Sequence, residues 1–339
     1  MIEENRIAKW DNLKFFLILC VVIGHTLHSF LDYSQLAKGL YLFIYSFHMP
    51  AFIFVAGLFS KHVIQEKRRE VVVQYLVIYL VMKFLDALAA FLSGSSFSFH
   101  FLWESGPGWF ALALAVYMIV GMYVRKFDSK YIMAAAIFIG CVAGLDTHFG
   151  DHFASMRICV FLPVFLAGYY IKPEALIYAK NKGIAVTRKI AALLIFAALL
   201  IISISKVDVL YPALKMFKGK YEYADMDMGI EGVVLRLLCY AFWAVMIYIV
   251  IAIVPKRNWI FTWFGKRTMA IFVWHNFFVS LVMTVLGGSA FLYGHLSHSY
   301  VFAGICVAII IAALCAYLPE FRIKKVEKKH RNISEKNLH

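Results

Sequence analysis

The chain has 339 residues, of which 63% are hydrophobic and only 16% are charged, and its formal net charge is +14. Soluble domains contain roughly 45–50% apolar and about 25% charged residues, so this composition excludes a soluble globular protein. The basic residues flank long apolar segments, which is typical of membrane proteins and gives no reason to expect a nucleic-acid partner.

Ten apolar segments approach the roughly 20 residues that a helix needs to cross the hydrocarbon core of a bilayer. We therefore expect an all-α, polytopic integral membrane protein with about ten transmembrane helices. They form one transmembrane domain, residues 1–320, followed by a basic cytoplasmic tail, 321–339, beside anionic lipid headgroups. The expected spans cover residues 13–31, 40–60, 71–93, 108–124, 131–147, 157–171, 190–205, 229–254, 268–287 and 300–318.

The uneven distribution of Lys and Arg predicts the orientation of these spans. An even number of spans puts both termini on one side, and 26 of the 34 basic residues lie on that side. Cytoplasmic loops carry such an excess, so both termini are predicted to be cytoplasmic. Two basic residues, Lys83 and Arg236, lie within spans, and six lie on the outer side: Lys38, Arg157, Lys206, Lys215, Lys218 and Lys220.

The first span places a cation and an imidazole on one helix face. Lys14 and His25 are eleven residues apart, which at about 100° per residue returns nearly to the same direction, roughly 16 Å further along the axis. Asp11 extends this stripe toward the cytoplasm, and His28 extends it outward. Ionisable side chains at membrane depth are expensive and usually functional. The alternative for Lys14 is an interfacial anchor whose ammonium snorkels to the headgroups.

Two later spans add imidazoles at a related depth. His48 lies roughly 12 Å from the outer end of the second span, and His25 lies roughly 18 Å from the inner end of the first, in a core about 30 Å thick. Pro50 removes a backbone donor and can free a carbonyl beside His48. His275, followed by Asn276, lies near the middle of the ninth span. The alternative is that each buried imidazole only bonds a neighbouring carbonyl.

Other polar residues lie near the ends of spans. Trp109 begins the fourth span, although an aromatic belt would explain it equally well. The loop 206–228 mixes basic, acidic and aromatic residues, as the rim of a polar-ligand site or an ordinary solvated loop would. No metal is expected, because the two short histidine clusters lack a full ligand set. Those clusters are His148, Asp151 and His152, and His295 with His298.

The motifs in these spans resemble acyltransferase family 3, a family of transmembrane acyltransferases, and most of all its fucose 4-O-acetylase-like branch, which acetylates bacterial surface sugars. Lys14 and His25 fit the family's spacing of a basic residue, ten residues and a histidine. The resemblance extends along nearly the whole chain, through "FHMP" at 47–50, "WF" at 109–110, "RICVFLPVFLAGYYI" at 157–171 and "FGKRTMAIFVWHNFF" at 264–278. The chain departs from the family pattern where Lys14 replaces an arginine and Ala56 a serine.

The resemblance implies a membrane O-acetyltransferase that uses acetyl-CoA as donor and a hydroxyl of a cell-surface or lipid-linked sugar as acceptor. It places the protein in the bacterial cytoplasmic membrane. A hydroxyl needs a base, and a neutral imidazole in a desolvated site can provide one. The implied catalytic residues are His25, His48 and His275. The residues expected to bind CoA at the cytoplasmic mouth are Lys14, Lys67, Arg68, Arg69, Lys266 and Arg267. The residues expected near the acceptor are Asp11, Trp109, Arg157, Glu231, Arg236 and Asn276.

Two other classes of function fit the same spans. A transporter or exporter could use intramembrane histidines to relay protons, although the halves of the chain show no convincing repeat of the kind many transporters have. A non-catalytic membrane sensor is the third. The sequence also leaves the oligomeric state open, a homodimer included.

Overall fold

The structure is a computed structural model that describes residues 8–97, 103, 106–146, 152–176, 182–296 and 299–321. Within these ranges the regular elements are helices, and an isolated bridge joins Trp103 and His152. The prediction of an all-α fold is therefore confirmed. The principal helices are α1 (Ala8–Leu27), α2 (Gln35–Tyr45), α3 (His48–Leu58), α4 (Lys61–Gln65), α5 (Arg69–Leu92), α6 (Trp109–Val124), α7 (Ser129–Val142), α8 (Ser155–Tyr170), α9 (Lys182–Ser205), α10 (Val207–Leu210), α11 (Ala213–Lys218), α12 (Glu231–Ile253), α13 (Ile260–Lys266), α14 (Thr268–Ser280), the π-helical η5 (Leu281–Val285), α15 (Gly288–His295) and α16 (Tyr300–Cys315).

The helices are those of a membrane protein. Six of the described helical segments are long and apolar enough to cross a bilayer, and four shorter apolar helices, α6, α7 with its 3₁₀ extension, α8 and α16, accompany them. The outward faces of α5, α9 and α12 carry large exposed apolar side chains, such as Leu80, Leu194 and Leu238, which suit contact with lipid. Ten spans with both termini in the cytoplasm remain a prediction. The basic tail from residue 322 onward lies outside the described residues.

The second predicted span, 40–60, is not one continuous helix. It is divided into α2 and α3, because Phe47 leaves the helical region with φ −140° and ψ −27°. Pro50 has no N–H to bond the carbonyl four residues earlier, and His48 bonds the Ile44 carbonyl through its ring rather than continuing the helix. The ninth span also changes character, since α14 passes into η5 at Leu281.

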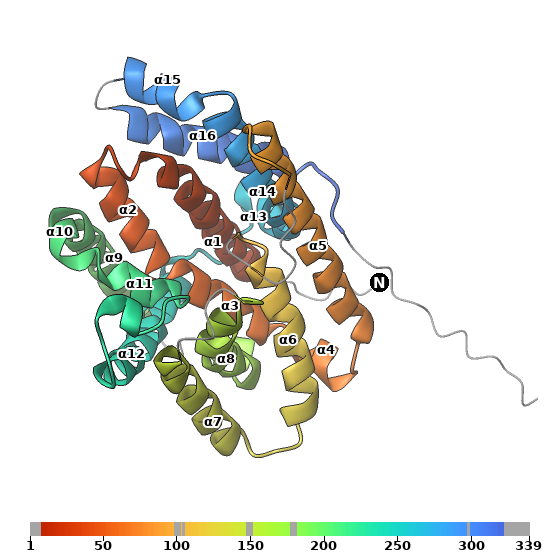
Figure 1. Ribbon diagram of the computed structural model, residues 1–339. Coiled ribbons are helices and arrows are strands. Elements are labelled where there is room, and N and C mark those ends of the chain that lie inside the picture. Colours follow the sequence, from red (N-terminus) through yellow and green to blue (C-terminus); the bar gives the residue numbers. More distant parts are fainter. Residues whose placement is uncertain are drawn as a thin grey trace, which may run out of the picture.

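Helix α1 lies in the middle of the bundle, between α14 and α16 on one side and α2 and α3 on the other (Figure 1). The N-terminal part of α1 holds the segment between α12 and α13. Asn12 Nδ2 donates to the carbonyls of Pro255 and Arg257 at 3.0 and 2.8 Å, and the Thr262 hydroxyl donates to Asn12 Oδ1 at 2.6 Å. These bonds fix the entry of the chain into α13 and α14.

Glycines allow the helices around the site to approach closely. A side chain on Gly57 of α3 would collide with the Phe165 carbonyl of α8, and one on Gly168 would collide with the Phe54 carbonyl. Small residues at such crossings are a common device of membrane helices. Gly24, beside His25, likewise leaves room for the ring of Tyr45. The packing thus brings α2 and α3 against the histidine face of α1.

Candidate active site

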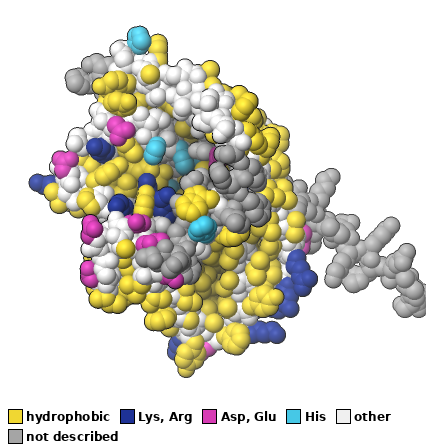
Figure 2. Space-filling view, viewed as in Figure 1, with side chains coloured by type: hydrophobic (Ala, Val, Ile, Leu, Met, Phe, Trp, Pro, Cys, Tyr) yellow, Lys and Arg dark blue, Asp and Glu magenta, His cyan; other side chains and the backbone are white. Residues whose placement is uncertain are grey.

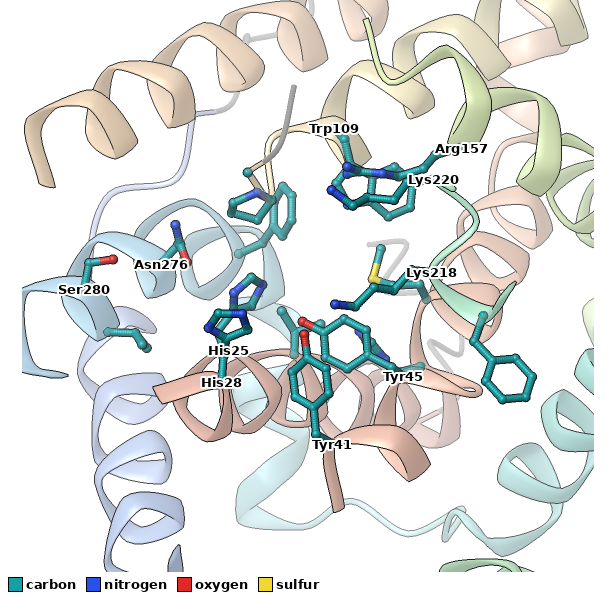
Figure 3. Close-up of a pocket in the computed structure, with 18 of the residues that line it drawn as sticks. His25, His28, Tyr41, Tyr45, Trp109, Arg157, Lys218, Lys220, Asn276 and Ser280 are labelled. Atoms are coloured by element: carbon teal, nitrogen blue, oxygen red, sulfur yellow. The ribbon is translucent and has the colours of Figure 1, made fainter. Parts of the chain in front are cut away.

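A cavity of about 470 Å³ opens at the end of the bundle where α1 ends. Its lining residues come from α1, α2, α3, α6, α8, α11, α14 and η5, and from the segments that follow α1 and α11. Its volume lies in the range of small-molecule sites, roughly 300–1,000 Å³. Figure 2 shows histidine and basic side chains gathered near the middle of this face, within a largely apolar surface. The polar and aromatic residues of the lining include His25, His28, Tyr41, Tyr45, His48, Trp109, Arg157, Lys218, Lys220 and Asn276 (Figure 3).

The three predicted histidines come together at the inner end of this cavity. His25 and His48 line it, and the ring centroids of His25 and His275 are 5.1 Å apart. His275 is fully buried behind His25 and does not line the cavity, whereas His25 itself is half-buried. The structure therefore places the three histidines close together, with His275 behind His25. Their catalytic role remains a prediction.

Hydrogen bonds to backbone carbonyls fix the tautomers of His48 and His275. His48 Nδ1 lies 2.7 Å from the Ile44 carbonyl, and His275 Nδ1 lies 2.7 Å from the Phe272 carbonyl. A carbonyl only accepts, so each Nδ1 carries the proton and each Nε2 carries a lone pair. Nε2 of His275 is buried and has no hydrogen-bond partner in the described part of the chain. It is an acceptor held beside His25.

Aromatic and cationic side chains form the outer wall. Tyr41 and Tyr45, one turn apart on α2, stack with centroids 4.0 Å apart, and Tyr45 meets the ring of His48 edge-on at 4.8 Å. The Lys218 ammonium lies over both tyrosines, 5.1 and 5.3 Å from their centroids. Such contacts are typical of cation–π attraction.

A second cation–aromatic pair lies in the same lining. The buried Arg157 guanidinium lies 5.1 Å from the ring of Trp109, which in turn stacks on Phe161 at 5.6 Å.

The surroundings of Lys218 favour its neutral form. The burial of its side chain, together with the neighbouring charges of Lys220 and Arg157, lowers the pKa of Lys218 to about 8. The cavity thus combines imidazoles at its base with aromatic faces and positive charge at its walls.

Residues 7–317 match the acyltransferase domain of acyltransferase family 3. The chain belongs to acyltransferase family 3. No curated protein and no solved structure matches it in the corresponding searches. Family membership makes this chain a membrane acyltransferase, and it favours the enzyme over the transporter and sensor interpretations.

Several lining residues of this family 3 acyltransferase were not among the sequence candidates. The spacing of Tyr41, Tyr45 and His48 would have placed them on one face of a continuous helix, so this signal was present in the sequence. Lys218 and Lys220 come from the loop 206–228, whose two interpretations the sequence left open. The structure favours the ligand-rim interpretation, because both lysines line the cavity.

Asn276 lines the cavity next to His275, and its Nδ2 donates to Asp86 Oδ1 at 2.7 Å. An amide nitrogen has two hydrogens, so one remains for another acceptor. Asp86 belongs to α5 and was not a candidate. Its signal was the presence of a carboxylate within an otherwise apolar span.

Arg236 and Glu231 lie outside the cavity lining. Arg236 is fully buried and donates through Nη1 to the Met216 carbonyl at 2.7 Å, so it holds the loop that carries Lys218. Glu231 is exposed at the start of α12 and accepts from the Gly229 amide at 2.9 Å. Neither residue is placed to contact a ligand in this cavity.

The Lys14 end of α1 is separate from the cavity. Lys14 Nζ pairs with Asp11 Oδ1 at 2.7 Å, and neither residue lines the cavity. Ile18 and Val21 lie between Lys14 and His25 on the same helix face. Ile18 is fully buried, and Val21 is the residue of α1 nearest to Lys14 that lines the cavity. Packed side chains therefore fill the helix face between Lys14 and the cavity.

The basic residues expected at the cytoplasmic mouth differ in their surroundings. Arg267 donates through Nε and Nη2 to the carbonyls of Ala316 and Leu318, both at 2.8 Å, so it caps the end of α16. Arg68 pairs with Glu70 at 2.7 Å. The exposed residues of this group are Lys67, Arg69 and Lys266.

The described residues contain no group of three or more side chains suited to a metal ion. Of the two histidine clusters, His152 stacks edge-on against Trp103 at 4.6 Å and His295 is exposed, whereas His148, Asp151 and His298 lie outside the described residues.

Proposed function

We propose that this membrane acyltransferase moves an acetyl group from acetyl-CoA to a hydroxyl of a cell-surface or lipid-linked sugar, with His25 as general base. The observation that carries the proposal is that His25 faces the cavity while the acceptor nitrogen of His275 lies behind it. Tyr41, Tyr45 and Trp109 add aromatic faces with polar tips, which suit a ligand that is apolar on one face and hydroxylated at its edge.

In the proposed reaction, one His25 nitrogen takes the proton of the acceptor hydroxyl while the hydroxyl oxygen attacks the carbonyl carbon of the thioester. The tetrahedral intermediate then collapses, the C–S bond breaks, and the departing sulfur takes the proton from the imidazolium. General-base assistance of this kind is typically worth about 10²–10⁴-fold in rate. The second His25 nitrogen carries a hydrogen that Nε2 of His275 is suited to accept, which would leave the first nitrogen unprotonated.

The intermediate carries a negative oxygen that needs hydrogen-bond donors. The second amide hydrogen of Asn276 and the indole N–H of Trp109 belong to the cavity lining and are our candidates. His48, whose Nδ1 is held by the Ile44 carbonyl, presents Nε2 and can orient the acceptor hydroxyl.

The donor is proposed to bind from the cytoplasmic side, where Lys14, Lys67, Arg69 and Lys266 offer charges for the phosphates of CoA. Since Ile18 fills the helix face between Lys14 and the cavity, the thioester would reach His25 only when the packing around Ile18 opens. With both termini cytoplasmic, the cavity would open to the outside of a bacterial cytoplasmic membrane. The acceptor would then enter from that side.

The proposal is tested by incubating the purified protein with acetyl-CoA labelled in the acetyl group, with and without a glycan acceptor. Free CoA is measured by chromatography, because the six free cysteines of the chain would interfere with a thiol reagent. We expect CoA release that depends on the acceptor and label that appears on the glycan as an ester. A folded protein that releases no CoA and puts no label on any acceptor would contradict acyl transfer.

A further inference from the structure

A second cavity, of about 460 Å³, lies between α11 and α12 and the loop that joins them. All but three of its lining residues are apolar, which sets it apart from the cavity lined by His25 and His48, here called the histidine cavity. We infer that the second cavity is a groove for the hydrocarbon chain of a lipid, and that this lipid carries the acceptor sugar. The inference rests on the proposed function, because it names the kind of acceptor that the same site takes.

One wall of the groove is a stripe along α12, a helix long and apolar enough to cross a bilayer. Its residues follow the i, i+3, i+4, i+7 spacing of one helix face, and they are Leu235, Leu238, Cys239 and Phe242. The stripe is roughly 10 Å long, and it runs in the direction in which lipid chains lie beside a membrane-crossing helix. Leu235 and Leu238 are also exposed, so a chain can enter the groove from the lipid without crossing polar surface.

The opposite wall is rich in methionine and comes from α11 and the loop that follows it. Met216 lies on α11, and Met226 and Met228 lie on the loop. Methionine side chains are unbranched and flexible, so they adapt to ligands of irregular or variable shape. Phe217 of α11 packs on Phe242 with ring centroids 5.5 Å apart and joins the two walls. Such a lining suits a flexible hydrocarbon chain better than a rigid polar molecule.

The charged lining residues of the groove are Lys215, Asp225 and Asp227, and all three are exposed. Lys215 Nζ donates to the Asp225 carbonyl at 2.6 Å, which ties α11 to the loop. The two aspartates come shortly before α12 begins at Glu231. With the predicted orientation of the spans, this end of α12 faces the outside, so the charged edge would lie near the lipid headgroups. The groove is thus apolar along the helix and polar at one edge, as an amphiphilic ligand requires.

The last turn of α11 separates the groove from the histidine cavity. Phe217 lines both, whereas its neighbour Met216 lines only the groove and its neighbour Lys218 only the histidine cavity. Arg236 fixes this turn by donating to the Met216 carbonyl at 2.7 Å. A lipid chain held in the groove would therefore keep the sugar attached to it next to the histidine cavity. Burial of the chain would add affinity that a polar sugar alone lacks.

Binding to the groove is tested first, without any acyl donor. The full-length protein is placed in phosphatidylcholine nanodiscs with hexadecyl β-glucoside that carries a photoreactive diazirine in its chain, and the labelled peptides are identified by mass spectrometry. An excess of unlabelled hexadecyl β-glucoside tests whether the labelling saturates. Methyl β-glucoside, which has the same sugar and lacks the chain, is the control competitor. Phosphatidylcholine that carries the same diazirine is used as a second probe.

We expect labelling of the groove that hexadecyl β-glucoside suppresses and methyl β-glucoside does not, and unsaturable labelling of the lipid-facing side of α9. Leu238→Trp should weaken the saturable labelling about tenfold, because losing contact with about two CH₂ groups is enough for such a change. Leu237→Trp is the matched control, since Leu237 is an exposed leucine of the same helix that lies outside the groove lining. Ala213→Trp fills the groove from α11 and is the second variant if Leu238→Trp does not fold.

Groove labelling that does not saturate would overturn the inference, and so would saturable labelling that survives a folded Leu238→Trp or Ala213→Trp protein. Equally strong saturable labelling by the phosphatidylcholine probe would assign the groove to ordinary membrane lipid and overturn the assignment to the acceptor.

Transfer is tested next, with labelled acetyl-CoA and with hexadecyl and methyl glycosides of glucose, galactose and N-acetylglucosamine. Membrane partitioning lowers the apparent KM of any long-chain glycoside, so the decisive comparison is between the two leucine variants. We expect Leu238→Trp to raise the KM for hexadecyl acceptors about tenfold with little change in kcat, and Leu237→Trp to match wild type. Saturable labelling without transfer to any acceptor would contradict the proposed function alone. Transfer with equal KM for hexadecyl and methyl glycosides would contradict only this inference.

Discussion

Nε2 of His275 carries a lone pair in a fully buried position, and the ring that bears it lies 5.1 Å, centroid to centroid, from the ring of His25. The Phe272 carbonyl holds this arrangement by accepting the hydrogen on Nδ1 of His275. The proposed base, His25, is thus backed by a nitrogen that can only accept a hydrogen bond, which is the arrangement needed to keep the cavity-facing nitrogen of His25 unprotonated.

The first prediction concerns this pairing. His275→Phe should lower kcat by about 10²-fold with little change in the KM for the acceptor, because it removes an orienting acceptor without touching the ligand. His275→Gln, which keeps an oxygen acceptor, should recover part of the loss. The readout is the dependence of kcat on pH, which should shift in His275→Phe. If His275→Phe had the kcat and the pH profile of the wild-type protein, His275 would be shown to contribute only to packing.

The second prediction follows from the pKa of Lys218, about 8. The ammonium predominates below that value and is lost above it, so affinity for a ligand that pairs with this ammonium should fall, by up to about tenfold, between pH 7 and pH 9.5. Lys218→Arg should stay protonated throughout this range and flatten the profile. This comparison separates Lys218 from the other ionisable groups around it, which are His25, His28, Tyr41, Tyr45, Arg157, Lys220 and Tyr221. A fall of the same size in Lys218→Arg would assign the effect to one of those groups.

The third prediction separates a structural arginine from a donor site. Arg267→Ala removes the bonds to the Ala316 and Leu318 carbonyls, so it should lower the free energy of unfolding by about 1–3 kcal/mol and leave the KM for acetyl-CoA unchanged. Lys266→Ala, at an exposed neighbour, should leave the thermal unfolding midpoint unchanged. A raised KM for acetyl-CoA with an unchanged unfolding midpoint in Arg267→Ala would contradict this structural role and indicate that Arg267 binds the donor.

The fourth prediction tests the crossing of α3 and α8. Gly57→Ala would drive a methyl group into the Phe165 carbonyl, so the helices must separate, and we expect a loss of stability of about 1–3 kcal/mol together with reduced activity, because α3 carries His48. Gly294→Ala is the control, since nothing lies near the place of its new methyl group. Thermal unfolding in detergent measures both. If Gly57→Ala and the wild-type protein unfolded at the same midpoint, α3 and α8 would be shown to accommodate the added methyl group.

The ten apolar segments and the meeting of three histidines could be predicted from the sequence, because hydropathy and helical rise are local properties. The helix break at Phe47 could not, since it depends on a ring-to-carbonyl bond as well as on Pro50. Lys218 could not be placed either, because its position depends on tertiary bonds, from Arg236 to the Met216 carbonyl and from Tyr223 to the Cys141 carbonyl, 82 residues earlier in the chain. The packing of Ile18 between Lys14 and His25 is likewise a tertiary property that helical phase alone does not contain.

The most direct test of the central claim is transfer of labelled acetyl to the glycan by the His25→Ala protein, compared with wild type and with His295→Ala, which alters an exposed histidine outside the cavity lining. All three proteins are first matched for thermal unfolding. We predict that the transfer rate of His25→Ala is about 10²–10⁴-fold lower than that of wild type. The rate of His295→Ala should stay within roughly twofold of wild type. A folded His25→Ala protein that transfers acetyl at the wild-type rate would contradict the account.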